Sequence, residues 1–350
     1  MKRITILFVA ILISLTSGFG EQINRYGSTA ASFLEIGMGS APSAMGEAYV
    51  AVTGELSSVY WNPASVAYLK KSSFSLMYQP WLVDINTIFA SGAVVVPGVG
   101  TLAISVTQVG YGEMQVTSLA HQDGTGEYFT ANDFAVGLSY ARKIANWFSF
   151  GATAKMINSQ IWHESASAFA LDLGVIVKTK FFSPKGEKGS GLDIGMSISN
   201  YGTRMQYDGI DLIQPIDISI DEAGNYGDVI GQYRTQEWEL PLMFRIGLAY
   251  KPIQTGYHSL TLAADALHPN NNSESINLGA EYALKISNSG KFFLRGGYKA
   301  LYMDETQFGL TAGGGIELFV IGNRSVKVDY AFKEAGIMGR THAYTLGLTF

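Results

Sequence analysis

Alternation of large apolar residues with small or charged ones is the feature that most restricts how this chain can fold. It runs over about nine to eleven residues at a time, the length of a tilted strand that crosses a bilayer. Extended chain places alternate residues on opposite faces, so each such segment presents one apolar face. The four clearest apolar faces are Phe169, Leu171, Leu173, Val175 and Val177; Leu192, Ile194, Met196 and Ile198; Leu242, Phe244, Ile246, Leu248 and Tyr250; and Val326, Val328, Tyr330 and Phe332. A soluble β-sandwich alternates in the same way, so the pattern alone predicts strands and leaves their surroundings open.

Composition favours a membrane barrel over the other classes. Hydrophobic residues make up 47% of the chain and mean hydropathy is +0.14, yet after residue 20 no stretch approaches the roughly twenty unbroken apolar residues of a membrane helix. The 40 Gly, 19 Tyr, 19 Phe and 15% charged residues fit strands with one face toward lipid and the other toward a packed interior. A net charge of -5 argues against a nucleic-acid partner.

The segments add up to an all-β fold, a transmembrane antiparallel β-barrel of about fourteen strands with a small N-terminal plug containing short helices. An even number of strands returns both termini to the periplasmic side. The predicted strands are 72–80, 84–96, 100–109, 132–143, 147–158, 165–178, 191–200, 239–251, 258–267, 275–286, 291–300, 306–319, 324–333 and 340–350.

Connections between these strands alternate in length, as they do in bacterial barrels with short periplasmic turns and longer external loops. The short ones are 97–99, 144–146, 286–290 and 320–323, and the mostly longer ones are 110–131, 201–238, 268–274, 301–305 and 334–339. The segment 180–190 is the one predicted periplasmic turn that is longer than the pattern requires.

Aromatic residues gather toward the strand ends, as expected for girdles at the two membrane interfaces, whereas a sandwich core would place them centrally. They include Tyr78, Trp81, Trp147, Phe148, Trp162, Trp238 and Tyr250. The last strand presents Tyr344, Leu346, Leu348 and Phe350 on one face. This aromatic ending resembles the C-terminal signal that the outer-membrane barrel-assembly machinery recognises, and we interpret the four residues as an assembly signal.

Residues 1–20 have the order of a secretory signal peptide: Lys2 and Arg3, an apolar run from Ile4 to Leu15, then small residues. A buried helix or an uncleaved anchor is the alternative for so short a run. The chain has no Cys, which excludes a lipoprotein anchor and disulfides. The sequence thus divides into a signal peptide (1–20), a plug or hatch segment (21–71) and the barrel (72–350), in the bacterial outer membrane with its lipid as a partner.

The plug segment is rich in Ala, Gly and Ser and lacks period-two alternation. Pro42 suits the first turn of a short helix, and the small residues from Ala44 to Val52 allow close packing. A disordered leader is the alternative, but Phe33, Leu34, Tyr49, Tyr60 and Trp61 supply more apolar surface than a disordered segment carries. Asn62-Pro63 favours a turn that fixes the plug to the wall; lining a solute path is the other possibility.

One stretch of this segment, Ala31 to Val52 followed by Ser57 to Ala64, resembles the N-terminal signature of the PorV/PorQ family of outer-membrane proteins, a branch of the FadL-like barrels. The resemblance rests on Phe33-Leu34-Glu35-Ile36, on Met45-Gly46 and on Trp61-Asn62-Pro63-Ala64, and continues weakly to Phe350. The family often has Gly where this chain has Glu47 and Ser65. It also often has two acidic residues where this chain has Gly54-Glu55. The candidate plug site is Phe33, Met45, Gly46, Tyr60, Trp61, Asn62, Pro63 and Ala64.

This resemblance implies a type IX secretion system component that binds or delivers exported cargo at the cell surface, with secretion-system components and cargo proteins as partners. The alternative is a FadL-like transporter of long-chain fatty acids or other hydrophobic compounds, whose ligand would meet Phe33, Met45, Tyr60 and Trp61. A third is a structural outer-membrane protein. For the first, the predicted contact surface is the apolar external loop 201–238, with Tyr201, Tyr207, Ile210, Leu212, Ile213, Ile216 and Ile220.

Signals for catalysis, metals or cofactors are weak. The run Gly98-Val99-Gly100-Thr101-Leu102-Ala103 matches a dinucleotide fingerprint by letter, but a strand pattern follows where a helix is required, so it predicts a hairpin turn. The five His residues are scattered and no Gly-x-Ser-x-Gly elbow occurs, so we expect no enzyme, metal or cofactor.

Charges on the predicted inner face have both signs, which indicates salt-bridged packing rather than an open ion-conducting pore. They are Asp172, Lys178, Asp193, Arg245, Asp265, Glu281, Arg295, Lys299, Glu317, Lys327 and Asp329.

Overall fold

The computed structural model describes residues 25–81, 83–183, 191–219, 221, 229–286, 289–320 and 324–350. The predicted signal peptide, residues 1–20, lies outside the described residues, as do Ile220 and most of the 180–190 turn. No helix among the described residues is long and apolar enough to cross a membrane.

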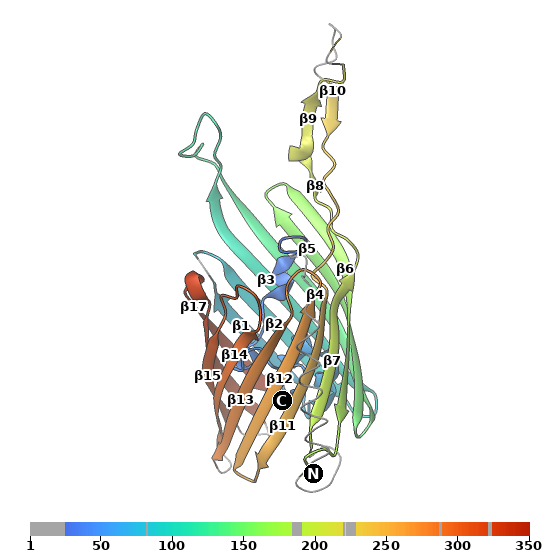
Figure 1. Ribbon diagram of the computed structural model, residues 1–350, viewed down its shortest axis with the longest axis vertical. Helices are drawn as coiled ribbons and strands as arrows, with labels where there is room; N and C mark the ends of the chain where they lie inside the picture. The colour runs from blue at the N-terminus through green and yellow to red at the C-terminus, as the bar shows by residue number, and fades with distance from the viewer. Residues whose placement is uncertain are drawn as a thin grey trace.

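In the described residues, fourteen antiparallel strands form a closed barrel (Figure 1). Each strand pairs with its two neighbours, and the first and last strands join through pairs from Ser73↔Thr349 to Tyr78↔Tyr344. The ring therefore has no open edge. Its strands are β1 (Ser73–Pro80), β2 (Asn86–Val96), β3 (Gly100–Gln115), β4 (Tyr128–Ala145), β5 (Phe148–Ile161), β6 (Glu164–Lys178), β7 (Asp193–Gly202), β11 (Met243–Gln254), β12 (His258–Pro269), β13 (Ser275–Ile286), β14 (Gly290–Leu301), β15 (Leu310–Val320), β16 (Arg324–Glu334) and β17 (Arg340–Thr349).

The predicted alternation is confirmed on all four of the clearest segments. On β6, Phe169 is 65% exposed whereas Asp172 on the opposite face is 1% exposed. On β11, Phe244, Ile246 and Leu248 face outward and Arg245 is buried. Large apolar side chains thus cover the outside of the barrel, and small or charged ones face the interior, as a membrane barrel requires.

Strand bounds differ from the prediction where local backbone breaks the alternation. Predicted to end at residue 109, β3 continues through a bulge between Gly110 and Glu113 to Gln115, and β4 is correspondingly longer. Beyond the barrel rim this hairpin is open to solvent on both faces, so it carries no period-two pattern. Predicted from residue 239, β11 begins only at Met243, because Pro241 has no amide hydrogen to donate to the ladder.

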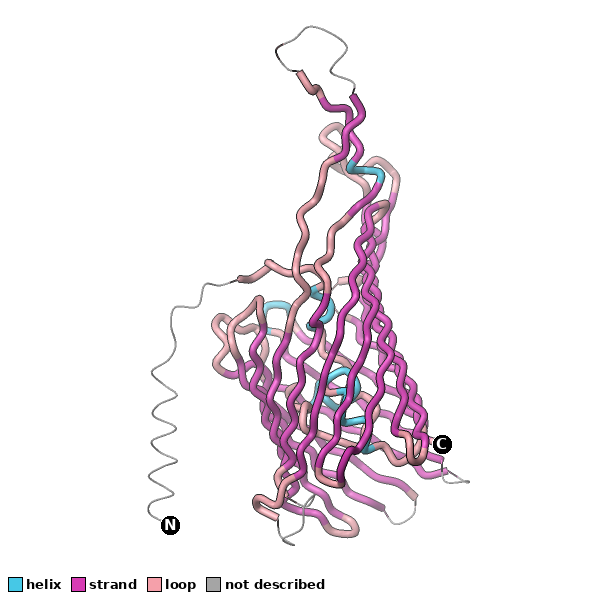
Figure 2. The backbone as a smooth tube through the Cα atoms, turned by 90° about the vertical axis from the view of Figure 1, so that its right-hand side faces the viewer, coloured by secondary structure: helices cyan, strands magenta, loops and turns pink. Residues whose placement is uncertain are grey.

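The plug lies largely inside the barrel; its described part runs from residue 25 to 71, and its first residues extend outside the wall (Figure 2). Its elements are η1 (Ser32–Glu35), α2 (Ser40–Ala44), α3 (Ser58–Trp61) and η2 (Pro63–Tyr68). These helices are only four to six residues long, too short to be stable alone, so their stability comes from packing against the wall. Every residue from Gly37 to Ala51 is buried.

The two ends of the barrel differ. At the terminal end, where β1 begins and β17 ends, the turns between β2 and β3 and between β4 and β5 are short. At the other, the loop end, the described residues of the segment 203–238 rise above the barrel (Figure 1). We name the residues 203–238 the extension; it contains β8 (Asp208–Gly209), η3 (Ile210–Leu212), β9 (Ile213–Ile216) and β10 (Val229–Gln232). A further turn of helix, η4 (Gly336–Met338), connects β16 to β17 at the loop end.

Candidate functional site

A belt of glycines on the inner wall brings the plug backbone into direct contact with the barrel. A Cβ on Gly297 would overlap the amide of Gly46, and one on Gly279 would overlap the carbonyl of Met45. Glycine at these positions leaves room for main chain to approach main chain. The belt positions are Gly151, Gly174, Gly195, Gly247, Gly279, Gly297 and Gly313, on β5, β6, β7, β11, β13, β14 and β15; at Gly174 and Gly313 the plug atoms in contact belong to side chains.

Wall side chains then bond the plug backbone. Gly46 has φ +63° and its amide donates to the Thr311 hydroxyl at 2.9 Å. The Asp265 carboxylate accepts from the amides of Tyr49 at 2.6 Å and Val50 at 2.9 Å. These buried amides have no partners within the short helices, so the wall supplies them.

Asn62 of the Trp-Asn-Pro-Ala element connects segments of the plug and the wall through its side chain. Its side-chain amide donates to the carbonyl of Val50 at 2.9 Å and to that of Val175 on β6 at 3.1 Å. The side-chain oxygen accepts from Ala64 at 3.0 Å, which caps η2, and Pro63 occupies the first turn of that helix. The geometry ties two parts of the plug to each other and to the wall.

The apolar plug residues lie in packed clusters. Phe33 packs with Val109, Ile157 and Leu240 and is 3% exposed. Met45 and Trp61 share another cluster and are fully or almost fully buried, and the Trp61 indole donates to the Met38 carbonyl at 2.9 Å. Tyr60 borders a cavity of about 20 Å³, which is roughly the space of one water molecule.

Two acidic residues of the plug form ion pairs with lysines of the wall. Glu47 lies 2.8 Å from Lys299 and 3.0 Å from Lys333. Burial acts to raise the pKa of Glu47, but the two lysines outweigh it and lower that pKa to about 2. Glu55 lies 2.5 Å from Lys327; burial is again outweighed, by Lys327 and Arg295, and its pKa is also lowered to about 2.

These ion pairs were not predicted from the sequence, where Glu47 and Glu55 stand only as departures from a family pattern. The sequence does indicate them, because an acid in a segment of small buried residues needs a cation from another part of the chain. Lys333 and Lys299 were available on inward-facing positions of the predicted strands.

Opposite charges on the inner wall are paired. The pairs are Lys155–Asp172 at 2.6 Å, Lys178–Asp193 at 2.9 Å, Arg295–Glu281 at 2.7 Å, Arg295–Asp329 at 2.6 Å and Lys291–Glu317 at 2.9 Å. Of the inward charges predicted, Arg245 donates instead to the Ser199 hydroxyl at 3.0 Å. In the part of the chain that the structure describes, no group of three or more metal-ligating side chains occurs.

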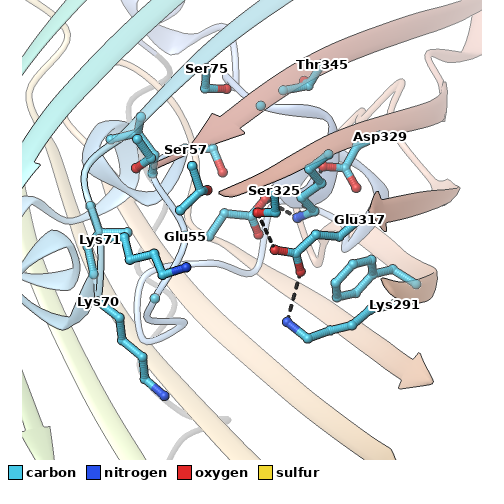
Figure 3. A pocket seen from close by; sticks show the side chains of 18 of the residues that line it. Glu55, Ser57, Lys70, Lys71, Ser75, Lys291, Glu317, Ser325, Asp329 and Thr345 are labelled. Carbon is cyan, nitrogen blue, oxygen red and sulfur yellow. Dashed lines mark hydrogen bonds and ion pairs between the residues drawn. The ribbon is translucent and has the colours of Figure 1, made fainter. Parts of the chain in front are cut away.

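A larger cavity of about 650 Å³ opens at the terminal end, between the end of the plug and β14 to β17. Figure 3 shows Lys70 and Lys71 on one side of it and Lys291 with Glu317 on the other. Its lining mixes charged side chains with apolar ones, among them Leu56, Phe293 and Phe319.

Most of the predicted contact residues of the external loop are solvent-accessible. Ile210 is 63% exposed and Ile213 is 45% exposed, and Leu212 and Ile216 are half-exposed. Tyr201 lies on the outer face of β7, below the extension, and Tyr207 packs partly against the Phe33 cluster. Ile218 and Ile230 add exposed apolar surface that the prediction did not name, at 64% and 80%.

The extension is also acidic. Between residues 205 and 233 the sequence has no Lys or Arg, and its acids are Asp208, Asp211, Asp217, Asp221, Glu222 and Asp228. At its base, Met205 and Trp238 exchange backbone hydrogen bonds of 2.8 and 2.9 Å, and Arg204 pairs with Glu239 at 2.8 Å. A fixed base therefore carries a ribbon that exposes apolar residues and has an acidic sequence.

At the other terminus, Tyr344, Leu346, Leu348 and Phe350 all lie on the outer face of the barrel, 40 to 61% exposed. The Phe350 amide donates to the Ser72 carbonyl at 3.0 Å. The chain end therefore lies beside the start of β1.

Solved structures with the same fold include a FadL homologue and two toluene transporters. A FadL homologue of Pseudomonas aeruginosa has 11% identity and a TM-score of 0.50, over 89% of this chain and 98% of that one. The toluene transporter TodX of Pseudomonas putida has 10% identity and a TM-score of 0.55, over 89% and 96%. The toluene transporter TbuX of Ralstonia pickettii has 11% identity and a TM-score of 0.54, over 89% and 97%. At these identities the likeness shows the fold alone.

A search of curated proteins found no significant match. A family model described as "Type IX secretion system protein PorV" matches residues 19–234, which is more than half of the 350-residue chain. This match, on a closed fourteen-stranded barrel with an N-terminal plug, shows that the chain belongs to the PorV family of outer-membrane β-barrel proteins.

Proposed function

We propose that this protein is a type IX secretion component that holds exported cargo at the cell surface through the extension. The observation that carries the proposal is the exposed apolar surface of the extension, above all Ile210, Ile213, Ile218 and Ile230, on a member of the PorV family. Isolated apolar residues on a surface are ordinary, but several on one projecting ribbon indicate a partner.

The charge of the extension defines the partner's chemistry. Because residues 205–233 contain six acids and no base, the complementary cargo face has apolar side chains surrounded by Lys or Arg. Such complementarity raises the rate of encounter and disfavours acidic proteins.

Orientation follows the usual arrangement of bacterial barrels. We place both termini and the short turns in the periplasm, and the extension and the β3–β4 hairpin outside the cell. In this arrangement the plug, fixed by the glycine belt, closes the lumen, and the loop end is the surface that binds cargo.

The test removes the extension beyond its base. Residues 208–232 are replaced by a short Gly-Ser linker, which keeps the Met205–Trp238 bridge. A matched control replaces residues 117–126 at the tip of the β3–β4 hairpin. We expect the first variant to reach the outer membrane and lose surface display of cargo, while the control keeps it. Normal display by a correctly inserted first variant would refute the proposal.

Hydrophobic transport is the second candidate, favoured by the fold shared with the toluene transporters. In that case Trp61→Ala should abolish uptake of a hydrophobic solute and leave cargo display intact. We favour secretion because Phe33, Met45 and Trp61 are packed in the core, and the cavity beside Tyr60 holds only about 20 Å³.

A further inference from the structure

A cluster of lysines surrounds the end of the plug at the terminal end of the barrel. Lys143 of β4 and Lys178 of β6 both lie over the ring of Tyr68, with their ammonium nitrogens 4.5 and 4.4 Å from its centroid. Lys70 is close enough to repel Lys143, and Lys251 of β11 is repelled by Lys178 and Lys70. Three strands and the plug thus bring four ammonium groups to one place.

Acids offset this cluster only in part: Asp193 and Glu281 act on Lys251 without forming an ion pair with it. Asp193 pairs with Lys178 at 2.9 Å. Within the described residues, no carboxylate lies in ion-pair contact with Lys70, Lys143 or Lys251. Like charges held together without counter-ions are costly unless an anion joins them.

The acids of the adjoining cavity are already used. Glu55 pairs with Lys327 and Glu317 with Lys291. Arg295, in the wall behind, pairs with both Glu281 and Asp329. Six Lys or Arg residues and four acids line this cavity, so Lys70 and Lys251 leave its lining positive overall.

Space for a ligand lies beside these lysines. The cavity of about 650 Å³ is lined by Tyr68, Lys70 and Lys251. A second cavity of about 140 Å³ is lined by Lys178, Asp193 and again Lys251. Lys251 thus joins the two cavities, and Asp193 holds Lys178 toward them.

We propose that Lys70, Lys178 and Lys251 form a binding site for a small solute that carries two or more phosphate or carboxylate groups. Lys143 reinforces the positive potential from behind the Tyr68 ring. The lysines of β4, β6 and β11 occupy inward-facing positions of their strands, so the wall separates the site from membrane lipid. This activity is independent of cargo binding by the extension, which lies at the opposite end of the barrel.

The experiment titrates the full-length protein in detergent with inorganic pyrophosphate and, separately, with citrate, using calorimetry at constant ionic strength. The variants are Lys251→Gln and Lys70→Gln. Lys285→Gln is the matched control, because Lys285 is exposed, is the second-last residue of β13 at the same end of the barrel and lines neither cavity. Retained heat-modifiable gel mobility shows that each variant is folded.

We expect saturable binding of at least one anion, weakened roughly tenfold or more in each cluster variant, as for loss of a charge-assisted hydrogen bond. Lys285→Gln should bind as the wild type does. Binding of pyrophosphate alone or citrate alone identifies phosphate or carboxylate as the recognised group. No saturable binding of either anion, or equal weakening by Lys285→Gln, would overturn the proposal.

Discussion

Glu47 of the plug lies 3.0 Å from the ammonium of Lys333 on β16, although 286 positions separate the two residues in the chain. Glu47 is 4% exposed and Lys333 2% exposed, so both charges have left water. Lys299 of β14 completes the group at 2.8 Å. Two neighbouring regions of the wall are thus bound to one plug carboxylate.

Replacing Glu47 with Gln should destabilise the protein, because Lys299 and Lys333 would be left buried without a counter-ion. Breaking one partner of a buried pair costs roughly 3–5 kcal/mol. Denaturant unfolding in detergent, followed by Trp fluorescence, measures the change. Glu237→Gln is the control, since Glu237 lies in an exposed pair with Arg234 at 3.7 Å. Equal denaturant midpoints for the two variants would contradict a stabilising role of the buried Glu47 ion pairs.

Acid should release the plug from the wall. The pKa of Glu47 and that of Glu55 are lowered in the folded protein from 4.5 to about 2. A lowered folded pKa stabilises the protein fully above the unfolded value, and this stability is lost as pH falls through the folded value. We therefore expect the denaturant midpoint to fall between about pH 4.5 and pH 2. The Glu47→Gln variant should show a smaller fall of the denaturant midpoint with pH. The same fall in this variant as in the wild type would contradict the prediction.

Adding a side chain to the glycine belt should displace the plug while the barrel stays intact. In Gly297→Val the new side chain overlaps the Met45–Gly46 backbone, and such overpacking costs roughly 1–3 kcal/mol. Protease cleavage within residues 25–71 should become faster, with heat-modifiable gel mobility retained. Gly296→Ala is the control, because its nearest neighbour would be the Thr311 carbonyl at 3.8 Å, an ordinary contact. Faster cleavage in both variants would point to general loosening instead.

Deleting Phe350 should lower the amount of protein in the outer membrane and leave the folded barrel's stability within about 0.5 kcal/mol of the wild type. Phe350 is 61% exposed on the outer face, so few contacts are lost when it is removed. Quantitative blotting of membrane fractions measures the first effect and denaturant unfolding the second. Normal abundance of the truncated protein would show that the residue is no assembly signal.

Much of the barrel was predictable because its constraint is local. Lipid on one side and packed interior on the other force alternation, so the faces of Phe169 and Asp172 on β6 follow from adjacent residues. The closed order of strands then follows from short turns and antiparallel pairing.

Contacts of the plug were not predictable in this way, because they join distant residues. Nothing near Glu47 in the chain indicates Lys333, and the belt position Gly297 is one among 40 glycines. Likewise, β9 and β10 pair with each other beyond the end of the barrel, where solvent on both sides removes the pattern that marked the other strands.

The glycine belt also bears on the order of events during assembly. Residue 71 passes directly into β1, and β1 pairs with β17, so the plug joins the seam where the ring closes. If the barrel closed first, the plug could enter it only through one of its ends. The glycine belt leaves space for the plug main chain and not for side chains passing along the wall. We therefore expect the fourteen strands to wrap around a plug already in place, with the N-terminal segment serving as the template on which the C-terminal strands complete the cylinder.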